Sequence, residues 1–290
     1  MEPHTILVTG ASGYLGRRVV RMGGRVGEVV GTRHTPNPSS GDQTLDVIDV
    51  GDANEVYNLV AEITPTVILH LAAVNPGQGD AEAMWRANVD GSANIAEAAQ
   101  RVGARLVAVS SDVVHDGTAA PYADDAVPHP LNDYARSKAA GEDAVLAACP
   151  DALVVRPSLI YGTDEMDRGT EGFVQRVHRG EHVSLFTDVI RNPVWVETLA
   201  DALLRFAVRR DRGTMNVAGR EPLTREAFGR MMLAYWGVED HGLVVPGLAS
   251  EVSDTIPTDL RLRIDRAESL LGVRFPGVSD VLAAARGRVS

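Results

Sequence analysis

A tyrosine and a lysine four residues apart form the first candidate catalytic pair, in the segment Tyr134-Ala-Arg-Ser-Lys138. On a helix this spacing puts both side chains on one face. A free tyrosine has a pKa of about 10 and exchanges protons poorly at neutral pH, and a neighbouring ammonium group lowers that pKa because it favours the phenolate. The pair therefore predicts proton transfer, with Tyr134 as general acid for a nascent alkoxide and Lys138 as the cation that tunes it.

Two adjacent serines could supply the hydroxyl that holds a substrate carbonyl. Ser110 and Ser111 stand at the end of an apolar run that predicts a strand, and α/β proteins bind ligands beyond the carboxyl ends of their strands. A fixed hydroxyl donor aimed at a carbonyl oxygen stabilises the charge that develops on it. A Tyr-x-x-x-Lys pattern alone also fits two solvated surface residues, so the pair gains weight only in combination with other motifs.

Three glycines follow the first apolar run, in the pattern Gly10-Ala-Ser-Gly13-Tyr-Leu-Gly16. Glycines so placed allow a tight turn, close approach of a pyrophosphate, and close packing of a helix on a strand. The start of the following helix offers N–H groups and the positive end of its dipole to phosphates. Because the pattern joins a strand to a helix, it predicts dinucleotide binding. The cofactor residues expected in this turn are Gly10, Ser12, Gly13, Tyr14, Leu15 and Gly16.

The second predicted strand ends in Gly31-Thr-Arg33-His34, without the carboxylate that binds a ribose 2′-hydroxyl in NAD-preferring sites. A planar guanidinium pairs well with a phosphate, so Arg33 is predicted to bind the 2′-phosphate of NADP(H). A solvated surface arginine is the alternative for Arg33, and His34 is either a further cofactor contact or an exposed loop residue. NADP(H) is therefore the predicted cofactor.

Short apolar runs alternate with longer helical patterns, which predicts βαβ units around a parallel sheet covered on both faces. The predicted strands are Thr5–Thr9, Glu28–Gly31, Val67–Leu71, Arg105–Ser110 and Leu153–Arg156. The predicted helices lie near Tyr14–Met22, Ala53–Ile63, Ala81–Val102, Asp133–Ala148, Phe173–Arg179, Val196–Arg209, Thr224–Trp236 and Asp265–Leu271, with loops at Thr35–Asp42 and Gly162–Gly172. The fold class is therefore α/β, with a Rossmann-type doubly wound sheet as an NADP-binding core over residues 1–160. Residues 161–290 are expected to form a smaller, interleaved C-terminal substrate lobe, with some segments returning to the core.

Composition narrows the class of protein further. The formal charge of −11 argues against a nucleic-acid-binding protein, which usually has a clustered basic face. The single cysteine, Cys149, excludes an internal disulfide and favours a cytoplasmic protein. No run approaches the roughly 20 apolar residues of a membrane helix, and the N-terminal segment lacks the basic start of a signal peptide. His178 and His182 do not form an H-E-x-x-H pattern, so no metal site is predicted.

Taken together, these motifs make the chain resemble the extended short-chain dehydrogenase/reductases over most of its length. Besides the glycine turn and Tyr134/Lys138, the matching residues are Asp46-Val47, Leu71-Ala72-Ala73, Asn88-Val-Asp-Gly91, Ser110-Ser111 and Arg156-Pro157. Within that family the chain is most similar to the dTDP-4-dehydrorhamnose reductase (RmlD-like) branch. The segments that carry this likeness are Ser110-Ser-Asp-Val-Val-His-Asp-Gly117, Pro130-Leu-Asn-Asp-Tyr134 and Asn192-Pro-Val-Trp-Val-Glu-Thr-Leu-Ala-Asp-Ala202.

The resemblance implies roles for individual residues. It implies that Ser111 assists catalysis, while Ser110 and Pro157 lie at the cofactor. It further implies that Asn88 and Lys138 support the ribose and the proton relay. The reaction it implies is hydride transfer from NADPH to a ketone, in particular the ketone of a nucleotide-linked 4-keto-6-deoxy sugar. Asp46 and Val47 are expected near the adenine, and Leu71, Ala72 and Ala73 along the cofactor.

Two departures from the family pattern bear on the substrate. The branch often carries an aromatic residue after the Arg-x-Ser of its sixth strand, but here the run is Arg156-Pro-Ser-Leu159, so a sugar-stacking contact is expected to be missing. The dehydratase branch carries an Asp-Glu pair after the catalytic hydroxyl residue, whereas Asp112 is followed by Val113, which argues against a dehydratase. The expected substrate contacts are Val74, Ser111, His115 and Arg191, although a salt bridge is an equal alternative for Arg191.

Two other functions stay open at this point. A nucleotide-sugar epimerase would recycle a tightly held NAD, which the Arg33 argument opposes. A non-catalytic NADP-binding regulator, like the regulatory subunit of methionine adenosyltransferase, shares this branch of the fold, and the Ser111/Tyr134/Lys138 set opposes it. The expected partner is a small-molecule substrate, a nucleotide sugar, with no nucleic acid and no membrane. Because many relatives pair helices into dimers, a homodimer is one expected assembly.

Overall fold

The computed structural model describes residues 4–35 and 45–287. By its contacts the chain divides into two compact units, each built from several stretches of sequence. The first unit comprises Met1–Val114, Asp133–Arg156 and Ala200–Met215, and the second comprises His115–Asn132, Pro157–Leu199 and Asn216–Ser290.

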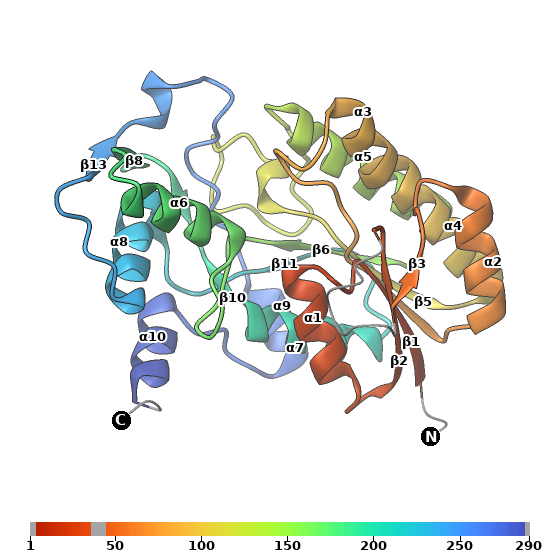
Figure 1. Ribbon diagram of the computed structural model, residues 1–290. Coiled ribbons are helices and arrows are strands. Elements are labelled where there is room, and N and C mark those ends of the chain that lie inside the picture. Colours follow the sequence, from red (N-terminus) through yellow and green to blue (C-terminus); the bar gives the residue numbers. More distant parts are fainter. Residues whose placement is uncertain (1–3, 36–44, 288–290) are drawn as a thin grey trace. The chain divides into compact units, whose positions relative to one another are not determined.

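Seven strands form the central sheet, in the order β11-β6-β5-β4-β1-β2-β3 (Figure 1). The pairs β1–β2, β1–β4, β2–β3, β4–β5 and β5–β6 are parallel. The chain order reverses between β1 and β4, and open α/β sheets bind ligands beyond the carboxyl ends of their strands at such a reversal. The strands are β1 (His4–Thr9), β2 (Gly27–Arg33), β3 (Asp46–Val47), β4 (Val67–His70), β5 (Arg105–Val109), β6 (Leu153–Pro157) and β11 (Gly213–Val217).

Helices cover both faces of this sheet. Helix α1 (Tyr14–Gly23) lies on one side of the strands, and α2 (Ala53–Ile63) and α4 (Gly91–Val102) lie on the other (Figure 1). Alternate residues of β1 serve the two faces, because Leu7 belongs to a core cluster with α2, α4 and α5 (Asp133–Ala148), while Ile6 and Val8 are also fully buried. Sequence had predicted such a covered parallel sheet, and the doubly wound α/β fold is confirmed. The same cluster contains Ile68, Leu106, Val154, Val56, Ile95 and Val145.

The long helical run predicted over Ala81–Val102 is divided into three parts. Helix α3 (Ala81–Trp85) passes into the π-helical turn η1 (Arg86–Asp90), and α4 follows directly. A π-turn widens the helix by an extra residue and is frequent at functional sites. Asn88, in the middle of this turn, is buried.

Helices and short strand pairs make up the second unit. Strands β7 (Ile160–Tyr161) and β10 (Val194–Trp195) are parallel, as are β8 (Val183–Phe186) and β13 (Val244–Gly247), while β9 (Ile190–Arg191) and β12 (Leu223–Thr224) are antiparallel. Among the described residues its core includes an apolar cluster around Tyr161 and Phe228 and another around Val174 and Leu185. Its remaining elements are α6 (Arg168–His178), α8 (Arg225–Trp236), η3 (Ala249–Glu251), α9 (Asp265–Leu271) and α10 (Val278–Arg286), and α7 (Val196–Ala207) continues into the first unit.

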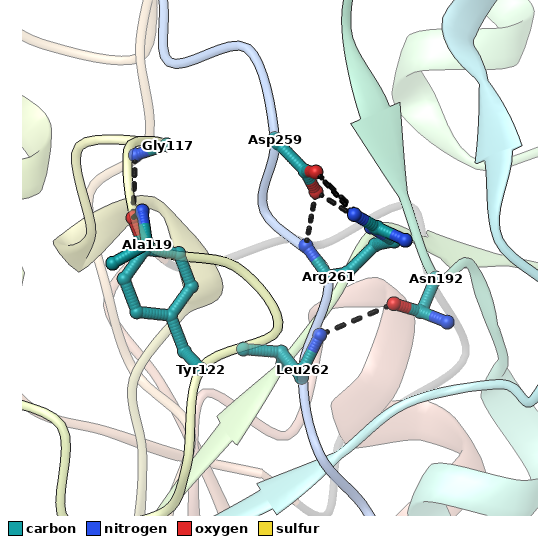
Figure 2. Close-up of polar contacts among 7 residues, drawn as sticks. All are labelled: Gly117, Ala119, Tyr122, Asn192, Asp259, Arg261 and Leu262. Atoms are coloured by element: carbon teal, nitrogen blue, oxygen red, sulfur yellow. Dashed lines mark hydrogen bonds and ion pairs between the residues drawn. The ribbon is translucent and has the colours of Figure 1, made fainter.

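Polar side chains fix the loops of the second unit (Figure 2). The Tyr122 hydroxyl accepts the N–H groups of Gly117 and Ala119 at 2.8 and 3.1 Å. The Asn192 side-chain oxygen accepts the Leu262 N–H at 3.2 Å. Both Tyr122 and Asn192 are buried. Asn192 is the first residue of the family-like segment Asn192–Ala202, and its side chain binds the backbone at Leu262.

Comparison with the expected elements shows where sequence patterns fail. All five predicted strands are present within two residues of their expected bounds, but β3, the strands β7 to β13 and the helix α10 were not predicted. The loop predicted over Gly162–Gly172 is wrong in its second half, because α6 begins at Arg168. The Asp167 carboxylate accepts the Gly169 and Thr170 N–H groups and so caps that helix early. The loop predicted at Thr35–Asp42 lies outside the described residues except for Thr35, which is exposed.

None of the helices in residues 4–35 and 45–287 has both the length and the apolar character that a membrane crossing requires.

An ion pair is buried between α5 and β6. Arg156 Nη2 lies 2.6 Å from Glu142 Oε2, and each side chain is only 3% exposed. Arg156 Nε also donates to Glu142 Oε1 at 2.9 Å. Removing one member of such a pair leaves an uncompensated buried charge, which costs far more than the loss of a surface pair.

Replacing Arg156 by methionine is expected to lower the free energy of unfolding by roughly 3 kcal/mol, because the Glu142 carboxylate then stays buried without its counter-charge. Arg205→Met is the matched control, since Arg205 pairs with Asp201 where both side chains are exposed and such a pair contributes at most about 1 kcal/mol. Urea denaturation followed by circular dichroism measures both variants. Equal destabilisation by the two would contradict this account of the buried pair.

Candidate active site

The turn between β1 and α1 depends on its glycines. Gly10 has a φ of +68°, in the left-handed region that glycine adopts without strain. A Cβ at Gly10 would lie 2.7 Å from the Ala72 backbone nitrogen, and a Cβ at Gly16 would overlap the Gly10 carbonyl oxygen. The turn therefore lies directly against the segment that follows β4. Two sets of predicted cofactor residues, the glycine turn and Leu71-Ala72, are thus brought together.

The start of α1 is open at the surface. Its N-cap is Gly13, so no side chain caps the helix, and both Ser12 and Gly13 are exposed. Tyr14, the first residue of the helix, is half-buried, while Leu15 is buried. N–H groups in the first turn of a helix have no acceptor inside that helix. An exposed helix start beside a tight glycine turn has the geometry that binds a phosphate.

The residues predicted to bind the adenosine end lie at the edge formed by β2 and β3. Arg33 ends β2 and is only 7% exposed, which excludes a fully solvated surface arginine. Asp46 and Val47 form β3 beside it, with Arg33 opposite Val47, and both are exposed. His34, the next residue after β2, is also exposed. The structure therefore places this predicted set at one sheet edge.

A chain of side-chain hydrogen bonds runs from β1 to η1. Thr9 Oγ1 lies 2.7 Å from His70 Nδ1, and His70 Nε2 lies 3.1 Å from Ser92 Oγ. Ser92 Oγ donates to the Asn88 carbonyl oxygen at 2.7 Å, and Thr9 Oγ1 accepts the Leu71 N–H at 3.2 Å. With these directions the Thr9 proton points to His70 Nδ1, and the ring proton of His70 sits on Nε2.

His70 keeps its ring neutral within this chain of bonds. Burial, with a smaller contribution from the Lys138 cation, lowers the pKa of His70 to about 3. A neutral imidazole can accept at one nitrogen and donate at the other. The ring therefore connects Thr9 to Ser92 without introducing a charge.

Asn88 fastens the loop after β4 to helix α5. Its Oδ1 accepts the Val74 N–H at 2.9 Å, and its Nδ2 donates to the Val74 carbonyl oxygen at 3.0 Å. The same Nδ2 donates to Ser137 Oγ at 2.9 Å, and Ser137 Oγ donates to the Tyr134 carbonyl oxygen at 2.8 Å. Asn88 and Val74 were both predicted as ligand contacts, and the structure shows that they are bonded to each other. Contact of Asn88 with a ribose stays a prediction.

Lys138 lies one helical turn after Tyr134 on α5 and is buried. Its Nζ donates to the carbonyl oxygen of Val109, the last residue of β5, at 2.9 Å. Burial lowers the pKa of Lys138 to about 8, although the Glu142 carboxylate raises it. Lys138 is thus a cation at pH 7 that can lose its proton not far above neutrality.

The two serines follow β5 directly. Ser111 Oγ lies 3.3 Å from Asp112 Oδ1, and the short helix η2 (Asp112–Val114) packs against α5. Ser110 is buried, and its hydroxyl has no hydrogen-bond partner in the described part of the chain. A buried hydroxyl without a partner is costly, so Ser110 Oγ suits a group that a bound ligand supplies.

Three predicted residues belong to the second unit. His115 is fully buried, and its ring stacks on that of Tyr122 with centroids 4.0 Å apart and planes 5° apart. Pro157 is the buried last residue of β6. Arg191 is half-buried in β9, opposite Leu223 of β12. Ligand contacts by His115, Pro157 and Arg191 stay predictions.

The first unit thus combines groups capable of acid–base chemistry with a turn that suits a bound nucleotide. It contains a phenol at Tyr134, a buried cation at Lys138, a hydroxyl at Ser111 and a glycine turn with an open helix start. The Tyr134 hydroxyl donates to Asn75 Oδ1 at 3.2 Å. Within residues 4–35 and 45–287, no group of three His, Cys, Asp or Glu side chains is arranged to hold a metal ion.

Sequence reasoning missed the residues that connect these groups. Thr9 and His70 come directly before the predicted Gly10 and Leu71, and Ser137 directly precedes Lys138. Their place beside predicted site residues was the only signal available. Thr9 and His70, which bond to each other, are 61 residues apart in the chain, and Ser137 is 49 residues from Asn88, so sequence spacing could not identify these pairs.

The chain matches one family model and is similar to known proteins over most of its length. The RmlD substrate binding domain matches residues 4–274. The chain is 30% identical over 288 residues to the probable low-salt glycan biosynthesis reductase Agl14 of Haloferax volcanii, covering 96% of this chain and 95% of that protein. It is 31% identical over 239 residues to the methionine adenosyltransferase 2 subunit beta of Bos taurus, covering 76% of this chain and 68% of that protein.

Among solved structures, the dTDP-4-dehydrorhamnose reductase of Bacillus anthracis in complex with NADP has a TM-score of 0.82 to this chain. The two share 23% sequence identity, and the match covers 99% of each chain. This likeness shows the common fold.

Acidification is expected to destabilise the folded protein through His70, but not through a surface histidine. Below about pH 6.5 the unfolded chain binds a proton at His70, whereas the folded protein, with a pKa of about 3 there, does not. The free energy of unfolding should therefore decrease as the pH is lowered below about 6.5, by up to about 1.4 kcal/mol per pH unit for this one group. His70→Gln keeps a side chain that can donate and accept hydrogen bonds but does not titrate, so its stability should fall less steeply.

His241→Gln, which changes an exposed histidine, is the matched control and should keep the wild-type slope. Urea denaturation at a series of pH values gives the slopes. If His70→Gln loses stability as steeply as the wild-type protein, the neutral buried ring is ruled out.

Proposed function

The chain belongs to the RmlD substrate binding domain family, and on that premise we propose that it is an NADP(H)-dependent oxidoreductase of the extended short-chain dehydrogenase/reductase type. The proposed reaction reduces the ketone of a nucleotide-linked 4-keto-6-deoxy sugar. The observation that carries the proposal is the pairing of Tyr134 with the buried Lys138 in the same compact unit as the glycine turn. The full-length likeness to a probable glycan biosynthesis reductase supports it, as does the shared fold with an NADP-bound dTDP-4-dehydrorhamnose reductase.

The first unit fits a nicotinamide dinucleotide at three points. The glycine turn has no room for a Cβ at Gly10 or Gly16, and the start of α1 next to it is exposed. The Ser110 hydroxyl is buried and has no partner among the described residues. Arg33 stands at the end of β2, where a 2′-phosphate would meet a guanidinium. When bound, the cofactor supplies the hydride.

The residues of this chain then manage the proton and the charge. Tyr134 donates its proton to the ketone oxygen as that oxygen becomes an alkoxide. Lys138, held by the Val109 carbonyl, keeps a positive charge one turn from the tyrosine and stabilises the phenolate that remains. Ser111 donates a hydrogen bond toward the same developing charge. Proton transfer by Tyr134 thus completes the reduction to an alcohol.

The rest of the proposal concerns partners and location. The first unit takes the cofactor, and the second takes most of the substrate, with His115 and Arg191 as contacts. A guanidinium pairs well with a phosphate, so Arg191 is assigned to the diphosphate of the nucleotide sugar. We also propose that the protein is a homodimer and that it is cytoplasmic. The single cysteine of the chain supports the cytoplasmic location.

Two other functions have weaker support. A regulatory, non-catalytic subunit is favoured by the likeness to methionine adenosyltransferase 2 subunit beta. Such a subunit has no use for a tyrosine beside a buried lysine, because no proton is transferred. An epimerase with tightly held NAD is opposed by the absence of a carboxylate at the end of β2, where Arg33 stands.

NADPH is expected to bind the purified protein about tenfold or more tightly than NADH, because only NADPH offers Arg33 a 2′-phosphate. Arg33→Ala should weaken NADPH binding alone and so remove the preference. Arg101→Ala, at an exposed arginine that pairs with Glu97 on α4, is the matched control. Fluorescence titration measures all these affinities. Equal affinities in the wild-type protein, or NAD retained through purification, would favour the epimerase.

Tyr134→Phe is expected to lower kcat by roughly 10²- to 10⁴-fold while leaving NADPH affinity nearly unchanged, because it removes only the general acid. Loss of NADPH absorbance with a panel of nucleotide-linked 4-keto sugars measures turnover. Tyr57→Phe removes a phenol on α2 that donates to Glu97 on α4, and it should keep wild-type turnover. A wild-type protein that binds NADPH but reduces no ketone of the panel would favour the regulatory subunit.

A further inference from the structure

A tight turn follows β4 and carries a side chain to Tyr134. The turn is Asn75-Pro-Gly77-Gln78, in which the Gln78 N–H donates to the Asn75 carbonyl oxygen at 3.0 Å. Gly77 has a φ of +75°. Proline at the second position and glycine with positive φ at the third are the residues that a type II turn requires. The backbone at Asn75 is therefore set by local sequence and needs no ligand to order it.

The side chain of Asn75 is oriented by the same turn. Its Nδ2 donates to Gln78 Oε1 at 3.0 Å, and its backbone N–H donates to the same oxygen at 3.0 Å. With its nitrogen turned to Gln78, the amide presents its oxygen to Tyr134, whose hydroxyl donates to Asn75 Oδ1 at 3.2 Å. Gln78 thus decides that Asn75 acts as an acceptor.

The loop and the tyrosine are fixed to a common support. Val74, the residue before Asn75, exchanges two hydrogen bonds with the buried Asn88 side chain. Asn88 also donates to Ser137, which lies one turn after Tyr134 on α5. The contact between Asn75 and Tyr134 therefore joins two segments that are already held together beneath it.

A phenol has one proton and can give it to one acceptor at a time. In the reduction proposed above, the acceptor is the ketone oxygen, so the hydroxyl must turn from Asn75 Oδ1 to that oxygen when the substrate binds. We propose that Asn75 is a positioning residue of this site: its amide oxygen holds the Tyr134 hydroxyl as an aimed proton donor in the free protein and is replaced as its acceptor by the ketone oxygen of the substrate. This inference rests on the proposed reductase function.

The need for such an acceptor follows from Lys138. A buried cation one turn away favours loss of the tyrosine proton, whereas an acceptor for that proton favours its retention. The same protein shows the stronger form of this effect at Tyr57, where donation to the Glu97 carboxylate at 2.6 Å raises the pKa of the phenol. A neutral amide does this without adding a charge, and a ketone oxygen, another carbonyl, can replace it.

The test titrates Tyr134 itself in the cofactor-free protein. Tyrosine labelled with carbon-13 at Cζ lets NMR follow each phenol, and the signal absent from Tyr134→Phe identifies Tyr134. The midpoint for Tyr134 should fall by roughly half to one pH unit in Asn75→Ala, which removes the acceptor. It should rise by about one unit in Asn75→Asp, which puts a carboxylate in the place of an amide of nearly the same shape. Gln78→Ala should move it in the same direction as Asn75→Ala, but less.

Other charges near α5 are the same in all these variants. Asn58→Ala and Asn58→Asp, made at an exposed asparagine of α2, are the matched controls and should leave the Tyr134 midpoint unchanged. The difference between the two Asn75 variants thus reports that position alone. The charged residues on α5 and on the elements packed against it are Asp133, Arg136, Lys138, Asp143, Asp112, Glu82, Arg86, Asp90, Glu97 and Arg101, together with the buried pair Glu142 and Arg156; His70 is titratable but neutral.

The ordered shift, lowest in Asn75→Ala and highest in Asn75→Asp, supports the inference, and identical midpoints or shifts of one sign overturn it. In the active enzyme the alkaline limb of kcat/KM should move in the same order. Turnover of a keto sugar without the ordered shifts overturns the Asn75 inference alone. Ordered shifts in a protein that reduces no keto sugar overturn the proposed function and, with it, the exchange of Asn75 for a ketone oxygen.

Discussion

The hydrogen bonds of the Asn88 amide hold the parts of this site together. The amide bonds to both backbone groups of Val74 and to Ser137, while the backbone carbonyl of Asn88 accepts from Ser92. Helix α5 can lie against this carbonyl only because residue 141 is glycine, where a Cβ would overlap the oxygen. Asn88 lies within a π-helical turn, a feature frequent at functional sites, and is buried. The loop that carries Asn75 and the helix that carries Tyr134 both depend on this one residue.

The contacts around α5 stabilise the buried ammonium group of Lys138. The Lys138 ammonium donates to a backbone carbonyl and lies one turn from Glu142, whose own charge is compensated by Arg156. His70, whose pKa the Lys138 cation helps to lower, stays neutral and so adds no second positive charge near Lys138. Burying an ion without partners costs several kcal/mol, and each of these contacts reduces that cost. The result is a buried positive charge one helical turn from the Tyr134 phenol.

Local signals in the sequence were sufficient for the sheet and for the glycine turn, and they named the candidate catalytic groups. Apolar runs found five strands, and the glycine pattern found the turn against Ala72, because in each case the relevant contacts follow from the residue types themselves. The π-turn was invisible because its residues keep the apolar spacing of an ordinary helix. β3 has two residues, too few for a periodic pattern. The partners of Asn75 and His70 come from distant segments, so only the folded chain could pair them.

The buried lysine also bears on the choice between an enzyme and a subunit that only binds a nucleotide. The glycine turn, the open start of α1 and Arg33 serve nucleotide binding equally well in either case. Desolvation of Lys138 lowers its pKa to about 8, which means that the fold forgoes stability to keep an ammonium group there. A protein that only binds a nucleotide can use Lys138 at the ribose alone, since it transfers no proton. A reductase gains more from it, because its tyrosine must lose a proton to the product and be stabilised as a phenolate until the proton is restored.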